Sequence, residues 1–325
     1  TRRSSDLVTG KVGVVIATSG PGATNLVTGI ATAMLDSIPM VAITGNVSTA
    51  LIGKDSFQEI NITGVTLPIT KHNYFVSDVR ELADTIREAF KIAKSGRPGP
   101  VLIDIPKDVQ AAECEFTKQG VVEYYPQGTA SDDEIDKAVD LINSAQRPYI
   151  YIGGGAAGAG MTDNIRALAE KIDGYIGCTF MGLSAFPSSY ERFLGMQGMH
   201  GQYASSMANK EADLIIGIGV RLSDRATGDV TKYSKSAKIV QLDTDLSEIN
   251  KNVKVDVGLI GDIVYSLSEI LNRCKKQEHH EWCETVENLK SEEHRIIDEA
   301  EAMSKTAMTP KKIFDVINEI KDADT

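Results

Sequence analysis

The amino-acid sequence predicts an α/β fold with two doubly wound parallel-sheet domains and a helical C-terminal tail. Short apolar runs alternate with amphipathic stretches through most of the 325 residues, a pattern typical of buried parallel strands joined by crossover helices. Two of these runs lead directly into glycine-rich turns, as strands of nucleotide-binding folds do. Charged stretches with a helical period close the chain and predict the tail.

In the first part of the chain, three apolar runs predict parallel strands and two amphipathic stretches predict the helices between them. The strands are expected at 12–18, 40–44 and 101–105, and the helices at 23–35 and 81–94. A doubly wound sheet of three strands is thin, and the chain begins directly on the strand that carries a glycine turn. We therefore expect an incomplete first domain at residues 1–112.

A second α/β domain is predicted after a linker at 113–130, where proline and glycine interrupt scattered charges. It begins with a capping box, in which Ser131 and Glu134 satisfy free amides of a helix that runs to residue 145. Its strands are expected at 149–152, 175–180, 214–220, 239–242 and 255–260. We place this domain at 131–275 and a helical connection at 276–325, with charged helices from 262 to about 303 and a last helix from Thr309-Pro310.

Composition and charge exclude several classes of protein. The formal net charge is −11 and no basic stripe occurs, which argues against a nucleic-acid partner. No apolar stretch approaches the roughly 18 residues of a membrane-spanning helix, and residues 1–10 lack the apolar core of a secretory signal. Four scattered cysteines form no disulfide pattern, so reduced thiols in the cytoplasm are expected.

The first glycine turn is Ser19-Gly20-Pro21-Gly22, between the first predicted strand and its helix. Glycine at these positions lets the backbone turn tightly and leaves no side chain between the main chain and a ligand. Amides at the start of the following helix can then face an anion or a polar ring. The alternative is a turn that needs glycine for packing alone.

The second domain carries two further ligand signals. Gly153-Gly154-Gly155-Ala156-Ala157-Gly158 follows a strand and satisfies the dinucleotide-binding fingerprint, although a structural turn rich in glycine and alanine matches that pattern easily. Arg221 and Arg225 follow another strand, where guanidinium groups suit a pyrophosphate, unless they belong to a solvated charged loop. Asp243 ends the next strand, where an acid commonly holds ribose hydroxyls.

A zinc site is the weaker interpretation of a short segment near the tail. Cys274, His279, His280 and Cys283 lie within ten residues, which is suggestive of zinc ligands. On a continuous helix the four cannot converge, because Cys274 and Cys283 are nine residues apart and lie on nearly opposite sides, although a turn would change this. We therefore predict a solvated helical hairpin and no metal site.

The order and spacing of several motifs resemble the large catalytic subunit of acetolactate synthase, a thiamine-diphosphate enzyme. The resemblance covers roughly residues 9–262 and rests on the glycine turn, two strand motifs, the loop at 52–59 and the segment at 70–74. These motifs read Pro39-Met40-Val41-Ala42-Ile43-Thr44-Gly45, Ile52-Gly53-Lys54-Asp55-Ser56-Phe57-Gln58-Glu59, Thr70-Lys71-His72-Asn73-Tyr74 and Gly96-Arg97-Pro98-Gly99-Pro100-Val101-Leu102-Ile103-Asp104-Ile105-Pro106. The resemblance implies a pyrimidine-binding first domain and a Rossmann-like central domain that binds FAD in an extended form.

The resemblance also implies roles for individual residues. In the first domain, Phe57 would be an apolar wall, Gln58 an amide that positions the bound intermediate, and Lys71 a cation at the substrate approach. The plain alternatives are a core phenylalanine, a surface amide and a solvated lysine. The residues expected to bind a cofactor are Gly20, Pro21, Gly22, Arg97, Gly153, Gly154, Gly155, Thr179, Phe180, Met181, Gly198, Met199, His200, Gly201, Gly219, Arg221, Arg225, Asp243 and Asp262.

Two positions depart from the family pattern. Ser223 stands where the family commonly has an acid, so this side chain keeps a hydrogen-bonding group but carries no charge. Ser48 stands where many members have proline, which puts the rim of the substrate channel in doubt.

The activity implied is decarboxylation of pyruvate and its carboligation to a second 2-oxo acid, in branched-chain amino-acid biosynthesis. Thiamine diphosphate and magnesium would serve the full-length enzyme, with FAD mainly structural. The expected partners are small 2-oxo acids, further copies in a homodimer or homotetramer and a possible regulatory subunit, with no nucleic acid and no membrane. The family's catalytic glutamate would precede Thr1 and its diphosphate-binding motif would follow Thr325, so we expect an internal piece that is inactive alone.

Two other functions stay open on the sequence. One is another thiamine-diphosphate enzyme, such as a glyoxylate carboligase, a sulfoacetaldehyde acetyltransferase or a 2-oxo acid decarboxylase. The other is a non-catalytic module that binds FAD or another nucleotide. Phe57-Gln58-Glu59, Lys71 and Gly198-Met199-His200-Gly201 favour acetolactate synthase.

Overall fold

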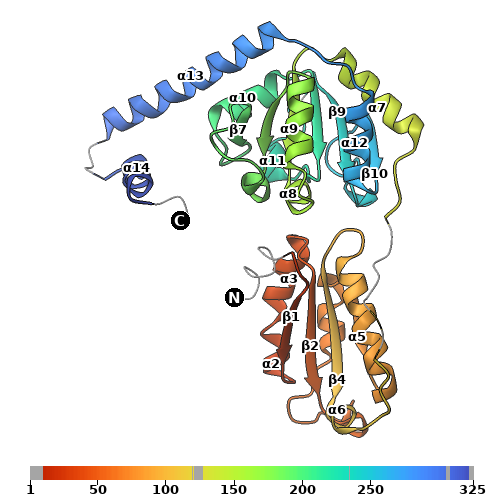
Figure 1. Ribbon diagram of the computed structural model, residues 1–325. Coiled ribbons are helices and arrows are strands. Elements are labelled where there is room, and N and C mark those ends of the chain that lie inside the picture. The colour runs from red at the N-terminus through yellow and green to blue at the C-terminus, as the bar shows by residue number, and fades with distance from the viewer. Residues whose placement is uncertain (1–9, 119, 121–126, 234, 305–307, 322–325) are drawn as a thin grey trace. The chain divides into compact units, whose positions relative to one another are not determined.

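The computed structural model describes residues 10–118, 120, 127–233, 235–304 and 308–321. The chain divides into two compact units, Thr1–Gly128 and Thr129–Thr325, each built on a parallel sheet (Figure 1). The α/β class predicted for both parts is confirmed. Part of the expected linker, at 119 and 121–126, lies outside the described residues.

The first unit is a four-stranded parallel sheet in the order β1-β2-β4-β3. One face packs on α5, around Val41, Val101 and Ile103, and the other on the α3 and α4 side, around Ala42 and Leu102. The strands are β1 (Gly13–Ala17), β2 (Met40–Asn46), β3 (His72–Phe75) and β4 (Pro100–Pro106). The helices are α2 (Pro21–Thr24), α3 (Val27–Leu35), α4 (Ile62–Thr66), α5 (Val79–Lys94) and α6 (Lys107–Ala111), with 3-10 turns η1 (Thr49–Leu51) and η2 (Leu67–Ile69).

The expectation of only three strands in the first unit was wrong. β3 consists of histidine, asparagine and two aromatic residues, and none of its side chains is fully buried, so it gives no apolar run. The helix expected at 23–35 begins earlier, because Pro21 occupies its first turn, and is interrupted after Thr24. There the Leu26 amide donates to the carbonyl of Ala23, three residues back, at 3.1 Å.

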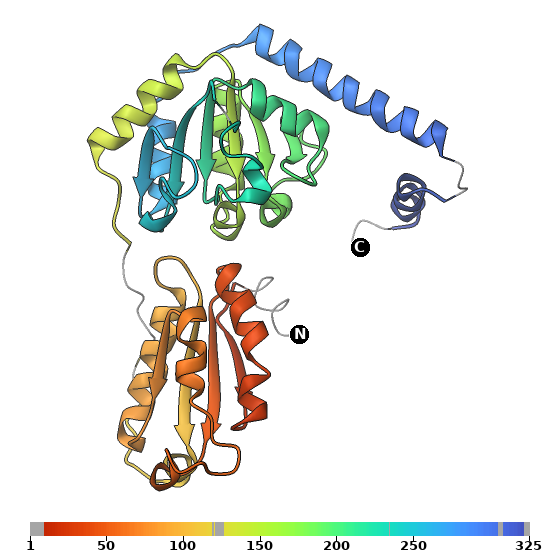
Figure 2. The same cartoon turned by 180° about the vertical axis from the view of Figure 1, so that it is seen from behind.

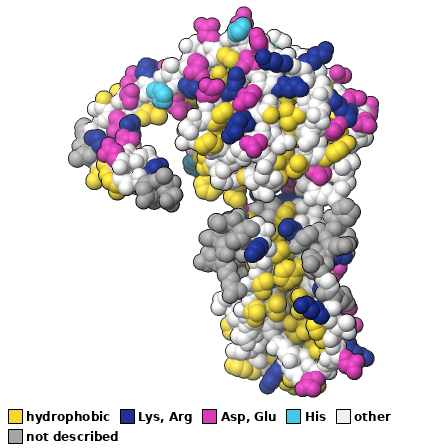
Figure 3. Space-filling view, viewed as in Figure 1, with side chains coloured by type: hydrophobic (Ala, Val, Ile, Leu, Met, Phe, Trp, Pro, Cys, Tyr) yellow, Lys and Arg dark blue, Asp and Glu magenta, His cyan; other side chains and the backbone are white. Residues whose placement is uncertain are grey.

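Apolar side chains are exposed along the first unit (Figure 3). Ile16 on β1 is 72% exposed although its partner in register, Ile43, packs in the cluster under α5. α5 packs on β2, β3 and β4. The apolar cluster between this helix and the sheet includes Val12 but not Ile16. The edge of the sheet at β1 is therefore apolar and open among the described residues.

The second unit is a six-stranded parallel sheet in the order β10-β9-β8-β5-β6-β7. Its strands are β5 (Pro148–Ile152), β6 (Tyr175–Cys178), β7 (Phe193–Met196), β8 (Leu214–Ile218), β9 (Lys238–Asp243) and β10 (Val257–Ile260). The chain adds β6 and β7 on one side of β5, then returns to place β8 on the other side. This is the strand order of dinucleotide-binding folds, and the order reverses between β5 and β8.

Helices cover both faces of this sheet. One face carries α7 (Asp132–Ser144), α9 (Thr162–Lys171) and α12 (Ile263–Arg273), and α9 and α12 lie in front of the strands in Figure 1. The opposite side, seen in Figure 2, packs α10 (Tyr203–Glu211) and the start of α13 (His280–Met303), where Trp282 is buried. The remaining elements are α8 (Gly154–Gly158), α11 (Asp224–Thr227), α14 (Pro310–Ile320), η3 (Phe180–Ala185) and η4 (Leu246–Glu248).

Two details of the second unit differ from expectation. β7 was not predicted, because it is a four-residue strand that contains Gly195 in a left-handed conformation, φ +77°. The strand expected at 175–180 ends at Cys178, and the chain then enters η3, where Phe180 is 73% exposed. Because Phe180 is apolar, the sequence prediction placed the end of this strand two residues beyond Cys178.

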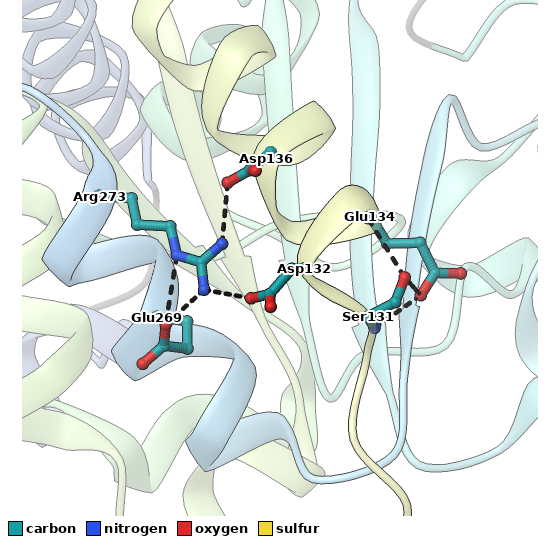
Figure 4. A network of polar contacts seen from close by, with 6 residues as sticks. All are labelled: Ser131, Asp132, Glu134, Asp136, Glu269 and Arg273. Carbon is teal, nitrogen blue, oxygen red and sulfur yellow. Dashed lines mark hydrogen bonds and ion pairs between the residues drawn. The ribbon is translucent and has the colours of Figure 1, made fainter.

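The predicted capping box at the start of the second unit is confirmed (Figure 4). The Ser131 amide donates to the carboxylate of Glu134 at 2.9 Å, and the Glu134 amide donates to Ser131 Oγ at 3.4 Å. On the neighbouring α12, Arg273 donates to Asp136 Oδ1 at 2.8 Å and to Asp132 of α7. α12 therefore belongs to the packed body of the second unit.

Candidate functional site

In the second unit, the turns after β5 and β8 meet in direct backbone contact. The Gly153 amide donates to the carbonyl of Ile218, and the Gly155 amide to the carbonyl of Gly219, both at 3.1 Å. A Cβ atom on Gly153 would lie 2.2 Å from the Gly219 oxygen, and Gly219 itself has φ +53°. Glycine is required here because the two turns interlock, and they do so where the strand order reverses.

The residues expected after β6 lie at the same edge of the sheet. The Thr179 amide donates to the carbonyl of Ile152 at 2.9 Å, which ties the end of β6 to the end of β5. A Cβ atom on Gly154 would lie 3.1 Å from Met181 Cβ, so Met181 packs over the fingerprint. The helix after the glycines is the short α8, and the one expected from residue 162 is the separate α9.

The segment Gly198–Gly201 meets the second arginine of the loop that follows β8. The Met199 amide donates to the carbonyl of Arg225 at 3.0 Å, and a guanidinium nitrogen of Arg225 lies 2.9 Å from Met199 Sδ. His200 is exposed beside them. Two motifs separated by more than twenty residues of sequence therefore form one surface.

The two predicted carboxylates have different surroundings. Asp243 is buried at the end of β9, and its Oδ1 accepts the amide of Asp245 at 2.9 Å. Asp262 caps α12 instead, since its Oδ1 accepts the amides of Val264 and Tyr265 at 2.9 and 3.1 Å. Asp262 is thus already used as a helix cap, whereas Asp243 ends its strand at the edge where the glycine turns meet.

Sequence reasoning missed Gln241, which supports the turn after β8. It is fully buried on β9, and its Nε2 donates to the carbonyl of Val220 at 3.1 Å, between Gly219 and Arg221. Its Oε1 has no hydrogen-bond partner among the described residues. A glutamine inside an apolar strand was the available signal, because a buried amide needs a specific partner.

In the first unit, Gln58 lies against the first glycine turn. A Cβ atom on Gly20 would be 2.8 Å from Gln58 Cβ, and both residues have left-handed backbones, φ +59° and +60°. The close approach requires glycine at position 20, which is also the N-cap of α2, with Pro21 in the first turn and Gly22 behind it. The glycine turn and the loop that carries Phe57 are therefore neighbours.

This loop is organised around the carboxylate of Glu59. It accepts the amide of Gly53 through Oε1 and that of Ser56 through Oε2, the latter at 3.0 Å. These backbone hydrogen bonds lower the pKa of Glu59 from its ordinary value. Phe57 is 88% exposed, so the loop presents Phe57 and the neighbouring Gln58 at the surface of the unit.

Lys71 and Arg97 are not brought to Gln58. Lys71 precedes β3, at the edge where the parallel strands begin, and its ammonium donates to the carbonyls of Ile92 and Ser95 at the end of α5. Burial lowers the pKa of Lys71 to about 8. Arg97 donates to Ser37 Oγ at 2.8 Å within the first unit. The roles expected for both remain predictions.

The segment considered for zinc contains a break between helices. α12 ends at Arg273 and α13 begins at His280, so Cys274 and Cys283 do not share a helix. Cys283 Sγ donates to Asp173 at 3.3 Å, and His279 Nε2 lies 2.9 Å from Gln277 Oε1. Within the described residues, no group of three His, Cys, Asp or Glu side chains is placed to hold a metal ion, and no helix has the length and apolar character needed to cross a membrane.

Comparison with known proteins agrees with this architecture. Residues 4–65 match the thiamine pyrophosphate enzyme N-terminal TPP binding domain, and residues 135–270 match the thiamine pyrophosphate enzyme central domain. The acetolactate synthase large subunit of Corynebacterium glutamicum is 45% identical over 300 residues, which cover 90% of this chain and 48% of the relative. The probable acetolactate synthase large subunit of Methanococcus aeolicus is 41% identical over 329 residues, or 96% and 55% of the two chains.

The acetolactate synthase of Mycobacterium leprae is 46% identical over 267 residues, which cover 81% of this chain and 43% of the relative. The chain thus spans about half the length of the curated relatives it matches. Both units are included in the matches, in the order that the structure shows. From its two domains and these relatives, the chain belongs to the thiamine pyrophosphate enzyme family.

Proposed function

We propose that this chain serves in an acetolactate synthase large subunit, which decarboxylates pyruvate and joins the product to a second 2-oxo acid. The observation that carries the proposal is 45% identity to the Corynebacterium glutamicum large subunit over 90% of this chain. The relatives from Methanococcus aeolicus and Mycobacterium leprae are named probable acetolactate synthase large subunit and acetolactate synthase. Another thiamine-diphosphate carboligase or decarboxylase, and a non-catalytic module, are therefore less favoured.

The residues of the first unit fit a site for thiamine diphosphate and substrate. When bound, thiamine diphosphate supplies the electron sink that decarboxylation of a 2-oxo acid requires. Gln58 offers an amide that both donates and accepts hydrogen bonds, and exposed Phe57 beside it offers an apolar wall. Lys71 remains a proposed cation at the substrate approach, and magnesium is proposed for the whole enzyme.

We further propose that the second unit binds FAD. Two glycine turns meet where the strand order reverses, with no side chain of their own at Gly153 and Gly219, and Asp243 ends the adjacent strand. Folds of this kind bind dinucleotides at that edge of the sheet. Arg221 and Arg225 supply guanidinium groups suited to a pyrophosphate, with Arg225 held beside Met199. Phe180, His200 and Asp262 complete the set proposed in this unit, in which FAD has a mainly structural role. Arg97, in the first unit, stays a prediction from the family resemblance.

The partners and the location are also proposals. The net charge of −11 and the absence of a basic stripe in the sequence argue against nucleic acid. Small 2-oxo acids are the proposed substrates, and the enzyme is proposed to act in branched-chain amino-acid biosynthesis. We propose a homodimer or homotetramer in the cytoplasm, with a regulatory subunit as a possible further partner and no membrane contact.

FAD binding is tested by titrating FAD into the protein while following flavin fluorescence and the melting temperature. A ligand that binds the native state raises the melting temperature by mass action. Arg225→Ala should weaken binding about tenfold or more, as for a lost charged hydrogen bond. Arg295→Ala is the matched control, because Arg295 pairs only with Glu292 and Glu299 of its own helix among the described residues. Absence of binding by folded protein would refute the FAD proposal.

The activity is tested in a chimaera in which this chain replaces the matching segment of the Corynebacterium glutamicum large subunit. We expect acetolactate to form from pyruvate in the presence of thiamine diphosphate, Mg²⁺ and FAD. Circular dichroism and FAD retention report whether the chimaera is folded. A folded chimaera that binds FAD and makes another carboligation or decarboxylation product would contradict the proposed reaction.

A further inference from the structure

One buried amide holds both ends of the loop that presents Gln58. We call residues 47–60, between β2 and α4, the Gln58 loop. Asn46 is the last residue of β2, and its Oδ1 accepts the amide of Val47, where the loop begins, at 2.8 Å. Its Nδ2 donates to the carbonyl of Ile60, where the loop ends, at 3.4 Å. Asn46 therefore joins the two ends of the loop.

A buried carboxylate on β4 determines which way this amide faces. Asp104 is 1% exposed, and its Oδ2 accepts Asn46 Nδ2 at 2.6 Å. Its Oδ1 accepts the hydroxyl of Thr44, its partner in register on β2, at 2.7 Å. With its NH2 group directed to the carboxylate, Asn46 must turn Oδ1 toward Val47. If the amide were reversed, its NH2 group would face the N–H of Val47, and two donors would oppose each other where the loop begins.

Two more carboxylates hold the Gln58 loop along its length. Asp108 Oδ1 accepts the amide of Thr49 at 2.9 Å, and Glu59 accepts the amides of Gly53 and Ser56. With its ends joined and its interior fixed, the loop keeps Gln58 in a left-handed conformation against Gly20. That conformation is disfavoured for a residue with a side chain, so the surrounding contacts must maintain it.

We propose that Asp104 is a positioning residue: by orienting the amide of Asn46, it holds both ends of the Gln58 loop and thereby places Gln58 beside the glycine turn at Gly20. The importance of Gln58 for the reaction rests on the proposed function. The contacts that link Asp104 to the loop are independent of that function, and they can be tested on this protein without an assay of activity.

The test is amide hydrogen exchange in Asp104→Leu. Leucine offers no acceptor to Asn46 Nδ2, so Asn46 loses the contact that orients its amide. Asparagine would be a weaker test, because its oxygen could still accept from Asn46 while its NH2 group donates to the Thr44 hydroxyl. We expect the amides of Val47, Thr49 and Ser56 to exchange about tenfold faster or more, as for local opening after the loss of one or two hydrogen bonds. The amide of Ala42, in the core of β2, should keep its rate. Trypsin cleavage after Lys54, which is exposed in the loop, should accelerate in parallel.

Thr44→Val is the matched control. It removes the other hydrogen bond to the same carboxylate with little change of side-chain volume, and Thr44 has no hydrogen bond to the loop. Loop exchange in this variant should stay near the wild-type rate. The double variant Asn46→Asp with Asp104→Asn restores a donor–acceptor match between the two positions, and the carboxylate on β2 can still accept from Val47, but it has no donor for the carbonyl of Ile60. It should recover protection at Val47 more than at the far end of the loop.

Three results would overturn the proposal: unchanged loop exchange in Asp104→Leu, an equal increase in Thr44→Val, or a uniform increase in loop and core amides. The last would mean that Asp104 only stabilises the whole unit. If Asp104→Leu does not fold, Asn46→Ala carries the same comparison with Thr44→Val, because it removes the contacts of Asn46 with Val47 and Ile60 and leaves Asp104 bonded to Thr44.

Discussion

In the second unit the turns after β5 and β8 touch through their backbones, whereas in the first unit the Gln58 loop is held by side-chain carboxylates. The interlocked turns depend on the absence of Cβ atoms at Gly153 and Gly219 and are joined by backbone hydrogen bonds. The loop depends on the acceptor oxygens of Asp104, Asp108 and Glu59. Added volume should therefore damage the interlocked turns, while loss of charge should damage the loop.

The largest effect is expected from added volume at the interlocked turns. Gly153→Ala should lower the free energy of unfolding by about 2–4 kcal/mol, because its Cβ would clash with backbone that cannot rotate away. Urea denaturation followed by circular dichroism measures the change. Gly158→Ala is the control, since nothing lies within 4 Å of its added Cβ. Equal stability of the two variants would show that the turns are looser than their contacts indicate.

Removal of the Gln58 amide should affect the reaction and leave the proposed FAD site in the second unit unchanged. In the chimaera, Gln58→Ala should cost roughly 1–3 kcal/mol of transition-state stabilisation, as for a hydrogen bond lost in a water-poor site. The affinity for FAD should hardly change. Comparing kcat/KM with the FAD dissociation constant separates the two sites. An unchanged kcat/KM would make Gln58 a surface amide, and weakened FAD binding would assign the loop to the other cofactor.

A substitution of Lys71, at the opposite edge of the first sheet, should have a smaller effect on stability. Lys71→Met should lower the free energy of unfolding by about 1 kcal/mol, because the ammonium satisfies two carbonyls at the end of α5. Thermal and urea unfolding measure the loss. Lys91→Met, at a partly exposed position on the same helix, is the control. A raised KM for pyruvate in the chimaera would support the proposed role at the substrate approach, and an unchanged KM would leave only the helix cap.

Acid should loosen the Gln58 loop before it affects the interlocked turns of the second unit. The pKa of Glu59 is lowered in the folded protein by its backbone hydrogen bonds, from an ordinary value of 4.5. Its contribution is therefore present above pH 4.5 and is lost as the pH falls through the lower, folded-state pKa. Hydrogen exchange at Ser56 should accelerate over that range relative to Gly155, whose amide bonds to a backbone carbonyl. Parallel acceleration at both amides would instead indicate global unfolding.

Much of the architecture could be predicted from the sequence, because it depends on local pattern. The apolar runs that became β2, β4, β5, β8 and β9 are continuous and buried, so their identity does not depend on distant partners. The capping box at Ser131 and Glu134 is local as well, since its hydrogen bonds join residues three apart. The two glycine turns, the arginines after β8 and Asp243 were identified from their positions after predicted strands. Resemblance to a known family supplied the other candidate residues, which no periodicity identifies.

The features that could not be predicted from the sequence depended on contacts between segments far apart in the chain. β3 and β7 are strands because neighbouring strands pair with them, although their own residues are short, mixed or interrupted by glycine. The sequence alone named Gly20 and Gln58, Gly153 and Gly219, and Met199 and Arg225, but only the tertiary structure brought each pair into contact. It also decided that Lys71 caps a helix at the opposite edge and that Asp104, through Asn46, holds the Gln58 loop. The physical reason is that a side chain's partner is set by strand order and register, which no local pattern encodes.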